Sequence, residues 1–259
     1  MYNIQVDTHV HTVLSGHAWS TLRENILQAV EVGLKGFCVT EHSGAMPGAA
    51  PEWSPVSMSM LPEYQDGLRL YRGLEADILA PDGTVCPSAE YLSKLEFCIA
   101  SMHIVAAHFE RSMSACTEAY LKALENPYIT VLGHVDRIAF PCDLESVVRK
   151  AQECGKLIEL NNASLIPARV SGHRNVFRLI ELCRQYDVPV CVCSDAHYYT
   201  MVGDFNLMEA ALAERDFPEE LIANRTIESF DGILQKRRES IEEYNRRMTN
   251  AEANREFVY

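Results

Sequence analysis

Three features are missing from this sequence of 259 residues. No apolar run is long enough to span a membrane. The nine cysteines, an odd number, include no C-x-x-C pair, so we expect reduced thiols rather than a disulfide framework. The N-terminal residues lead straight into a strand pattern, without the basic and apolar regions of a signal peptide. Together these absences predict a cytoplasmic protein that has no membrane partner.

Basic charge is also scarce. The chain has 23 Lys and Arg residues against 36 Asp and Glu residues, which gives a formal net charge of −13. An acidic surface of this kind repels a phosphate backbone, and the sequence contains no sign of a basic groove. We therefore expect no nucleic-acid partner. An anionic substrate would need a local positive field, which metal ions could supply.

Strand patterns and helix patterns alternate along the chain, and the first helix begins at a capping box, Thr21-x-x-Glu24. The expected strands cover residues 4–11, 36–40, 68–74, 97–101, 130–133, 157–160 and 189–193. Seven units of strand then helix predict a parallel sheet, for which a barrel is the simplest closed form. We expect a single domain over residues 1–259. A C-terminal helix from about residue 230 would pack on it or at a subunit interface, which leaves a homo-oligomer open.

Six of these seven strands end in a side chain that can bind a metal ion. The residues are His9 and His11, His42, Glu75, His103, His134, and the pair Asp195 and His197, with His17 in the loop that follows the first strand. The C-terminal ends of barrel strands meet on one face, so we expect these side chains to share one pocket. Imidazole and carboxylate ligands without a thiolate suit zinc, manganese or iron.

The order of the motifs is more specific than any one of them. They are D-x-H-x-H from Asp7 with His17 six residues later, T-E-H at 40–42, G-x-E-A-D at 73–77, a further histidine, G-H at 133–134 and S-D-A-H at 194–197. This set resembles the PHP family, named for polymerase and histidinol phosphatase. It is most similar to the stand-alone bacterial phosphatase branch. The resemblance runs from residue 3 to about residue 230 and implies a distorted (β/α)7 TIM-like barrel. Glu41 departs from it, since the family usually has Asp there.

The resemblance also implies a trinuclear metal centre. One ion would be held by His9, His11, Glu75 and Asp195, a second by His103 and His134 with Glu75 bridging, and a third by His17, His42 and His197. We expect three divalent transition-metal ions, zinc first, with manganese or iron as alternatives. Their charge would outweigh the two carboxylates and make the pocket positive.

The expected reaction is hydrolysis of a small phosphorylated substrate, a phosphate monoester, by attack of a metal-bound hydroxide. Glu75, Asp195 and His17 are the candidate catalytic residues, and Asp195 or a nearby histidine could protonate the leaving group. Arg169 is the first candidate for binding the phosphate, and Arg137 is the second. An ordinary surface arginine is the alternative interpretation of Arg169.

Three other functions stay open. A phosphodiesterase or exonuclease-type phosphoesterase acting on nucleotides would use the same ions, but it would require a basic groove to bind the nucleic-acid backbone. A metal-dependent amidohydrolase also begins with H-x-H, although that class draws histidines from strands five and six, and the sixth strand here ends in Asn161. A non-catalytic metal-binding module would be expected to have lost ligands, whereas this chain has the full set.

Overall fold

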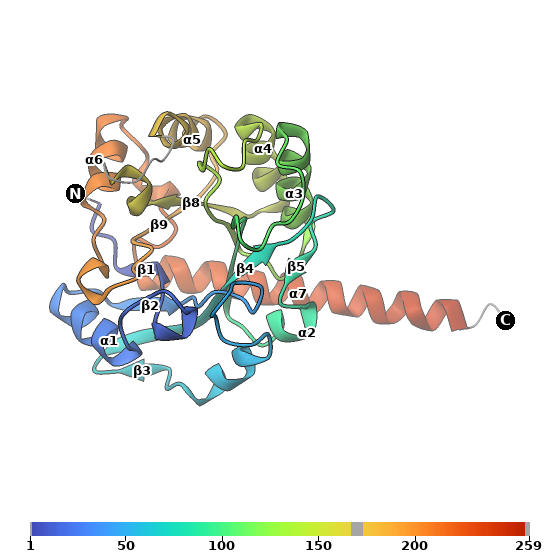
Figure 1. The fold of residues 1–259 in the computed structure, drawn as a ribbon, viewed down its shortest axis with the longest axis horizontal. Coiled ribbons are helices and arrows are strands. Elements are labelled where there is room, and N and C mark those ends of the chain that lie inside the picture. Colours follow the sequence, from blue (N-terminus) through green and yellow to red (C-terminus); the bar gives the residue numbers. More distant parts are fainter. Residues whose placement is uncertain (1, 167–172, 257–259) are drawn as a thin grey trace.

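The computed structural model describes residues 2–166 and 173–256, and its centre is a parallel sheet of seven strands (Figure 1). These are β1 (Val6–Val10), β2 (Gly36–Val39), β4 (Leu68–Ile78), β6 (Phe97–Ser101), β7 (Val131–Leu132), β8 (Leu157–Asn161) and β9 (Val190–Cys193), hydrogen-bonded in that order. An isolated parallel bridge between Val10 and Ala196 brings the end of β9 back to β1. The sheet is therefore a nearly closed barrel, and the predicted distorted (β/α)7 TIM-like architecture is confirmed.

The strands differ from the prediction mainly around β4. Two short antiparallel strands pair with it, β3 (Tyr64–Gln65) and β5 (Val85–Cys86), and neither was expected. β4 itself continues to Ile78, so Glu75 lies inside the strand rather than after it. The prediction ended this strand at Glu75 because charged side chains are seldom buried. In the structure Glu75 is buried, and its carboxylate belongs to a cluster of polar side chains.

Helices surround the barrel. They are α1 (Leu22–Glu31), α2 (Ala89–Leu92), α3 (Met113–Glu125), α4 (Leu144–Cys154), α5 (His173–Gln185) and α6 (Asn206–Glu214), with short 3-10 turns η1 (Val13–Ser15), η2 (Ser54–Met60), η3 (Asn162–Leu165), η4 (Tyr199–Met201) and η5 (Glu219–Leu221). The predicted capping box of α1 is present, because the Thr21 hydroxyl accepts from the backbone N–H of Glu24 and the backbone N–H of Thr21 donates to the Glu24 carboxylate. No helix among the described residues is long and apolar enough to cross a membrane.

The last helix, α7 (Ile227–Glu256), closes one end of the barrel and then projects beyond it (Figure 1). Near its start, the ring of Phe230 packs against Tyr71 and Phe97, with centroids 5.0 and 5.4 Å apart. One turn after Leu234, which is also buried there, Arg237 donates hydrogen bonds to two backbone carbonyls. This end of the barrel is apolar, so the polar residues of the interior lie toward the C-terminal strand ends.

Candidate metal centre

Glu75 is the central residue of the polar cluster, and it is fully buried. Its Oε1 atom lies 3.3 Å from His103 Nε2 and 3.1 Å from His134 Nε2. These two histidines follow β6 and β7, the next two strands of the barrel after β4. One carboxylate oxygen therefore faces two imidazoles that come from neighbouring strand ends.

The other oxygen of Glu75 faces three more histidines. Oε2 lies 3.2 Å from His9 Nε2, 3.6 Å from His11 Nε2 and 2.8 Å from His42 Nδ1. His9 lies in β1 and His11 just after it, so period-two alternation turns both rings to the same side. Glu75 thus stands between two groups of imidazoles, the position that a bridging ligand requires.

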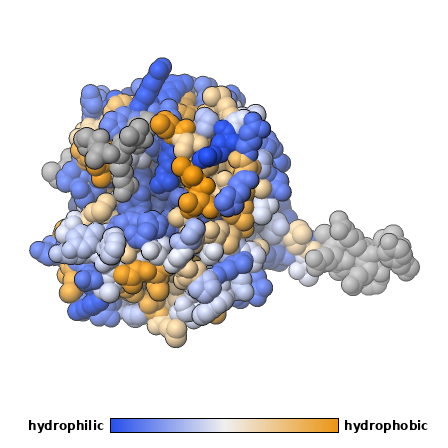
Figure 2. Space-filling model, viewed as in Figure 1, coloured by the Kyte–Doolittle hydropathy of each residue, from blue (hydrophilic) through white to orange (hydrophobic). Residues whose placement is uncertain are grey.

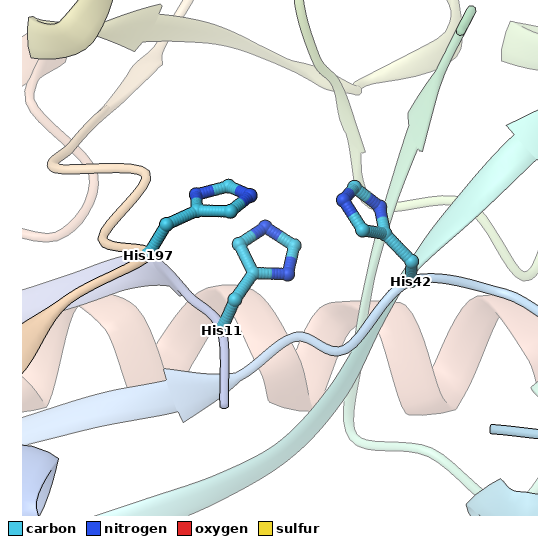
Figure 3. A group of neighbouring side chains, drawn as sticks. All are labelled: His11, His42 and His197. Atoms are coloured by element: carbon cyan, nitrogen blue, oxygen red, sulfur yellow. The ribbon is translucent and has the colours of Figure 1, made fainter. Parts of the chain in front are cut away.

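Asp195 and His197 complete the cluster from the end of β9. Asp195 Oδ1 lies 3.4 Å from His11 Nε2 and 3.8 Å from His9 Nε2. The rings of His11, His42 and His197 turn toward a common space (Figure 3). His17 Nε2 lies 2.9 Å from His197 Nε2, and its ring stacks on that of His42. The structure therefore brings together all nine of the side chains that the sequence singled out as metal ligands.

Several of these atoms are buried without a hydrogen bond. In the described part of the chain they include His9 Nε2, His11 Nε2, His42 Nδ1, His103 Nε2 and both oxygens of Glu75. Buried polar atoms almost always have partners, so a group of them converging without hydrogen-bond geometry needs an explanation. Divalent cations bound between the imidazoles and the carboxylates would satisfy all of them. The donor set thus fits a centre that holds more than one ion.

In three of these histidines, the ring nitrogen that points away from the cluster has a polar partner of its own. His9 Nδ1 lies 2.5 Å from Glu159 Oε1, and His103 Nδ1 lies 2.7 Å from Asp77 Oδ1. His11 Nδ1 lies 2.9 Å from the hydroxyl of Ser15. Contacts of this kind fix the tautomer and the orientation of the ring, so that Nε2 stays directed at the cluster.

Sequence reasoning did not assign a role to Glu159. This buried residue of β8 also accepts a hydrogen bond from the backbone N–H of His134, and Cys193 Sγ donates to it across 3.2 Å. The signal was a glutamate inside a strand with Ile158 and Leu160 on either side, because a buried carboxylate requires partners. Burial raises the pKa of the Cys193 thiol well above its ordinary value, so Cys193 stays a protonated donor.

Two other carboxylates lie near the cluster without facing its centre. Asp7 accepts hydrogen bonds from Ser194 and from the backbone of Gly203, and so ties β1 to the loop after β9. Glu41 accepts hydrogen bonds from Thr12 and Ser15. The carboxylate of Glu41 therefore supports the Ser15 hydroxyl behind His11.

The electrostatic environment shifts the pKa values of two histidines in opposite directions. Burial lowers the pKa of His11 well below its ordinary value, and the neighbouring His42 and His197 lower it further. Burial would also lower the pKa of His103, but Glu75 and Asp77 outweigh it and raise that pKa to about 9. His11 is therefore in the neutral form that binds metals at neutral pH, whereas His103 must release a proton to bind one.

The backbone at the cluster is unusual at two points. His134 and Asp195 have φ values of 54° and 55°, in the left-handed region that side chains other than glycine seldom adopt. Gly133, just before His134, lies so close to β6 that a Cβ atom there would be 2.4 Å from the Ser101 hydroxyl oxygen. Such strain persists only where the surroundings impose it, and it is typical of functional sites.

A cavity of about 680 Å³ opens above this cluster. It is lined by His17, Trp19, His134, Arg137, Ile138, Ala139, Asn161, Ala163, Ser164, Asp195, His197, Tyr198 and Met201. Nη2 of Arg137 lies 2.9 Å from His134 Nε2, so this candidate phosphate-binding residue is at the cluster. The other candidate, Arg169, lies outside the described residues.

The fold and this cluster define a parallel α/β barrel with buried imidazole and carboxylate groups at the C-terminal strand ends that could hold metal ions. The model of the PHP domain family matches residues 7–165, and this chain belongs to that family. Proteins of Caldicellulosiruptor bescii and Acetivibrio thermocellus, each named "Probable phosphatase", are 36% identical to it. The alignments cover 89% and 91% of this chain and 95% and 97% of those proteins, respectively. These relatives support a phosphatase of the PHP type.

A solved structure has the same fold. The histidinol phosphate phosphatase of Lactococcus lactis, complexed with zinc, L-histidinol and phosphate, superposes with a TM-score of 0.56. The superposition covers 83% of this chain and 94% of that one, at 15% sequence identity. At this identity the likeness extends to the barrel and not to the substrate.

Proposed function

We propose that this protein hydrolyses small phosphate monoesters with the help of three divalent ions, zinc first. The observation that carries the proposal is the convergence on Glu75 of buried imidazole nitrogens that lack hydrogen bonds, beneath a cavity that is lined by other members of the cluster and by Arg137. The names of the bacterial relatives and of the zinc-containing Lactococcus protein support the same class.

The residues divide into three proposed ion sites. His9, His11, Glu75 and Asp195 would hold one ion, His103 and His134 a second one that shares Glu75, and His17, His42 and His197 a third. Ions held there would supply Lewis acidity and positive charge for attack of water on phosphorus. A dianionic monoester has three terminal oxygens, which suits a positive pocket of this size.

The chain's own side chains would position the ester and move its proton. In the proposed complex, Arg137 donates to a phosphoryl oxygen, because its guanidinium already reaches the cluster and carries a permanent charge. Glu75 sets the spacing of the two groups of imidazoles. Asp195 or His17, both of which line the cavity, would be the proton donor to the departing alkoxide.

The proposal is tested by the ratio of kcat/KM for para-nitrophenyl phosphate and bis-para-nitrophenyl phosphate at one pH and one metal loading. We expect the monoester to be preferred by a wide margin, with inorganic phosphate as a competitive inhibitor. Preference for the diester would favour the nuclease-like alternative. Hydrolysis of an amide but of neither phosphate ester would indicate an amidohydrolase.

A further inference from the structure

The cavity is larger than the phosphate group of a substrate requires. Its volume of about 680 Å³ falls within the range of pockets that enclose a whole small molecule. The ion-binding cluster occupies only its floor, formed by His17, His134, Asp195 and His197. The remaining walls must therefore contact the leaving group, and their chemistry indicates what that group is.

The walls above the cluster carry large, exposed apolar side chains, although Asn161 and Ser164 also line the cavity. Trp19 is 80% exposed, Ile138 is 54% exposed and Tyr198 is 46% exposed, and all three line the same cavity with Met201. Figure 2 shows residues of high hydropathy, in orange, next to a blue hollow on the face turned toward the viewer. Large apolar side chains that gather at one opening mark a surface that binds something apolar. A phosphate group alone gives them no partner.

The position of Trp19 is fixed by its backbone. Its N–H donates to the carbonyl oxygen of His197 across 2.8 Å, and the hydroxyl of the next residue, Ser20, accepts from the N–H of Tyr199 across 2.7 Å. These bonds join the segment after β1 to the segment after β9, on either side of Tyr198. The indole is thus carried by a backbone anchored next to the cluster, which suits it to hold a ligand in one place.

The charge of the walls excludes one kind of leaving group. Among the described residues that line the cavity, Asp195 is the sole carboxylate, and it is engaged with the histidines. The cation among them is Arg137, which already reaches the cluster. An ammonium group on the substrate would lie near the positive charge of Arg137, with no further carboxylate among these described residues to pair with it.

We propose that the substrate is a phosphate monoester whose leaving group is uncharged, apolar and about the size of an aromatic ring, held against Trp19 with Ile138 and Tyr198 beside it. This inference rests on the proposed phosphatase function. It adds to that function a selectivity set by the cavity walls rather than by the ion-binding cluster.

The test compares three alkyl phosphates that differ at the far end of the leaving group: 2-phenylethyl, propyl and 2-aminoethyl phosphate. The wild-type enzyme should prefer 2-phenylethyl over propyl phosphate in kcat/KM, and 2-aminoethyl phosphate should be the poorest. Trp19→Ala should reduce the preference for the phenyl group by about three- to tenfold, the scale of one aromatic contact, and Trp19→Phe should keep most of it. Comparing the same pair of esters in each variant cancels their different intrinsic reactivities.

Trp53→Ala is the matched control. Trp53 is the chain's other tryptophan and is 58% exposed, but it does not line the cavity. The preference should be unchanged in this variant. A preference that survives in Trp19→Ala, or 2-aminoethyl phosphate as good a substrate as propyl phosphate, would overturn the inference and leave the phosphatase intact. Failure to hydrolyse any monoester would overturn both.

A binding measurement gives a readout other than turnover. Trp53→Phe leaves Trp19 as the single tryptophan, so fluorescence reports on the cavity wall alone. Adding 2-phenylethylphosphonate, which is not hydrolysed, should change the emission of Trp19 at concentrations where propylphosphonate does not. Equal responses to the two phosphonates would contradict contact between the ring and Trp19.

Discussion

Glu159 Oε1 lies 2.5 Å from Nδ1 of His9, and the two residues are 150 positions apart in the sequence. Both side chains are buried. The other carboxylate oxygen of Glu159 accepts the backbone N–H of His134 and lies 3.5 Å from its ring Nδ1. One carboxylate therefore supports two histidines that belong to different proposed ion sites.

This relationship predicts that Glu159 controls metal affinity without touching an ion. Removing a carboxylate behind a ligating histidine typically weakens metal binding 10- to 100-fold. We expect about tenfold weaker zinc binding for Glu159→Gln and a larger loss for Glu159→Ala, measured by competition with a chelator of known affinity. Glu153→Gln, at an exposed position of α4, is the matched control. Unchanged zinc affinity in Glu159→Ala would show that His9 needs no support.

Glu75 should be the most sensitive residue of the centre. Because its two oxygens face different groups of imidazoles, Glu75→Gln disturbs two proposed ions at once. We expect it to lose more phosphatase activity than a substitution of His17, His42 or His197, each of which would serve one ion. Initial rates on para-nitrophenyl phosphate, at matched metal loading, make the comparison. Equal losses at Glu75 and His42 would count against the bridge.

Much of this fold and site could be predicted from the sequence because two local rules apply to it. Strand-and-helix alternation indicates a parallel barrel, and barrel strands direct their C-terminal ends to one face. His42, His103 and His134 were found in this way, each just after an apolar run. Neither rule needs any knowledge of which strands are neighbours.

The rest depended on contacts that no local pattern encodes. Glu159 acquires its role only when β8 lies between β7 and β9, which brings it to His9 and His134. The length of β4 was underestimated because Glu75 interrupts an apolar run, yet the barrel interior stabilises that charge with histidines. The bonds of Asp7 to Ser194 and Gly203 likewise join residues 187 and 196 positions apart, which no local pattern specifies.

Metal analysis should find close to three transition-metal ions per chain. Removing them with a chelator should abolish phosphatase activity and lower the Tm, because buried carboxylates and imidazoles would lose their shared partners. Adding back zinc or manganese should restore both. A content near two ions would indicate a vacant third site. No bound metal even after reconstitution would exclude the proposed centre.

Metal binding should release protons. In the metal-free protein, Glu75 and Asp77 overcome the effect of burial and raise the pKa of His103 to about 9, so this histidine carries a proton at pH 7. That proton must leave before Nε2 can bind an ion, and affinity should therefore rise as the pH increases from 6 to 8. Calorimetry in buffers of different ionisation enthalpy measures the protons released. The His103→Asn variant should release fewer protons on binding metal. Release of an equal number would mean that the proton comes from a residue other than His103.

A final prediction concerns the opposite end of the barrel, where Lys156 is enclosed beside α7. Its Nζ atom donates to the carbonyl oxygen of Ile129 across 2.5 Å, and no ion pair joins it to a carboxylate among the described residues. Burial lowers the pKa of Lys156 from 10.5 to about 8, and the nearby Arg237 adds to the effect. At neutral pH the folded protein therefore keeps a cation in an unfavourable place.

The stability of the folded state should consequently rise with pH between about 8 and 10.5. Between these two pH values, Lys156 has lost its proton in the folded chain but still holds it in the unfolded chain. The full free-energy cost of burying the charged ammonium group therefore applies only below pH 8. The rise should be about 2 kcal/mol after allowance for partial exposure. Urea unfolding of the metal-free protein at pH 7 to 10 should show the free energy of unfolding of the wild type increasing relative to that of Lys156→Met. Lys236→Met, at an exposed position nearby, should follow the wild type. A constant difference between wild type and Lys156→Met across this range would mean that Lys156 keeps an ordinary pKa.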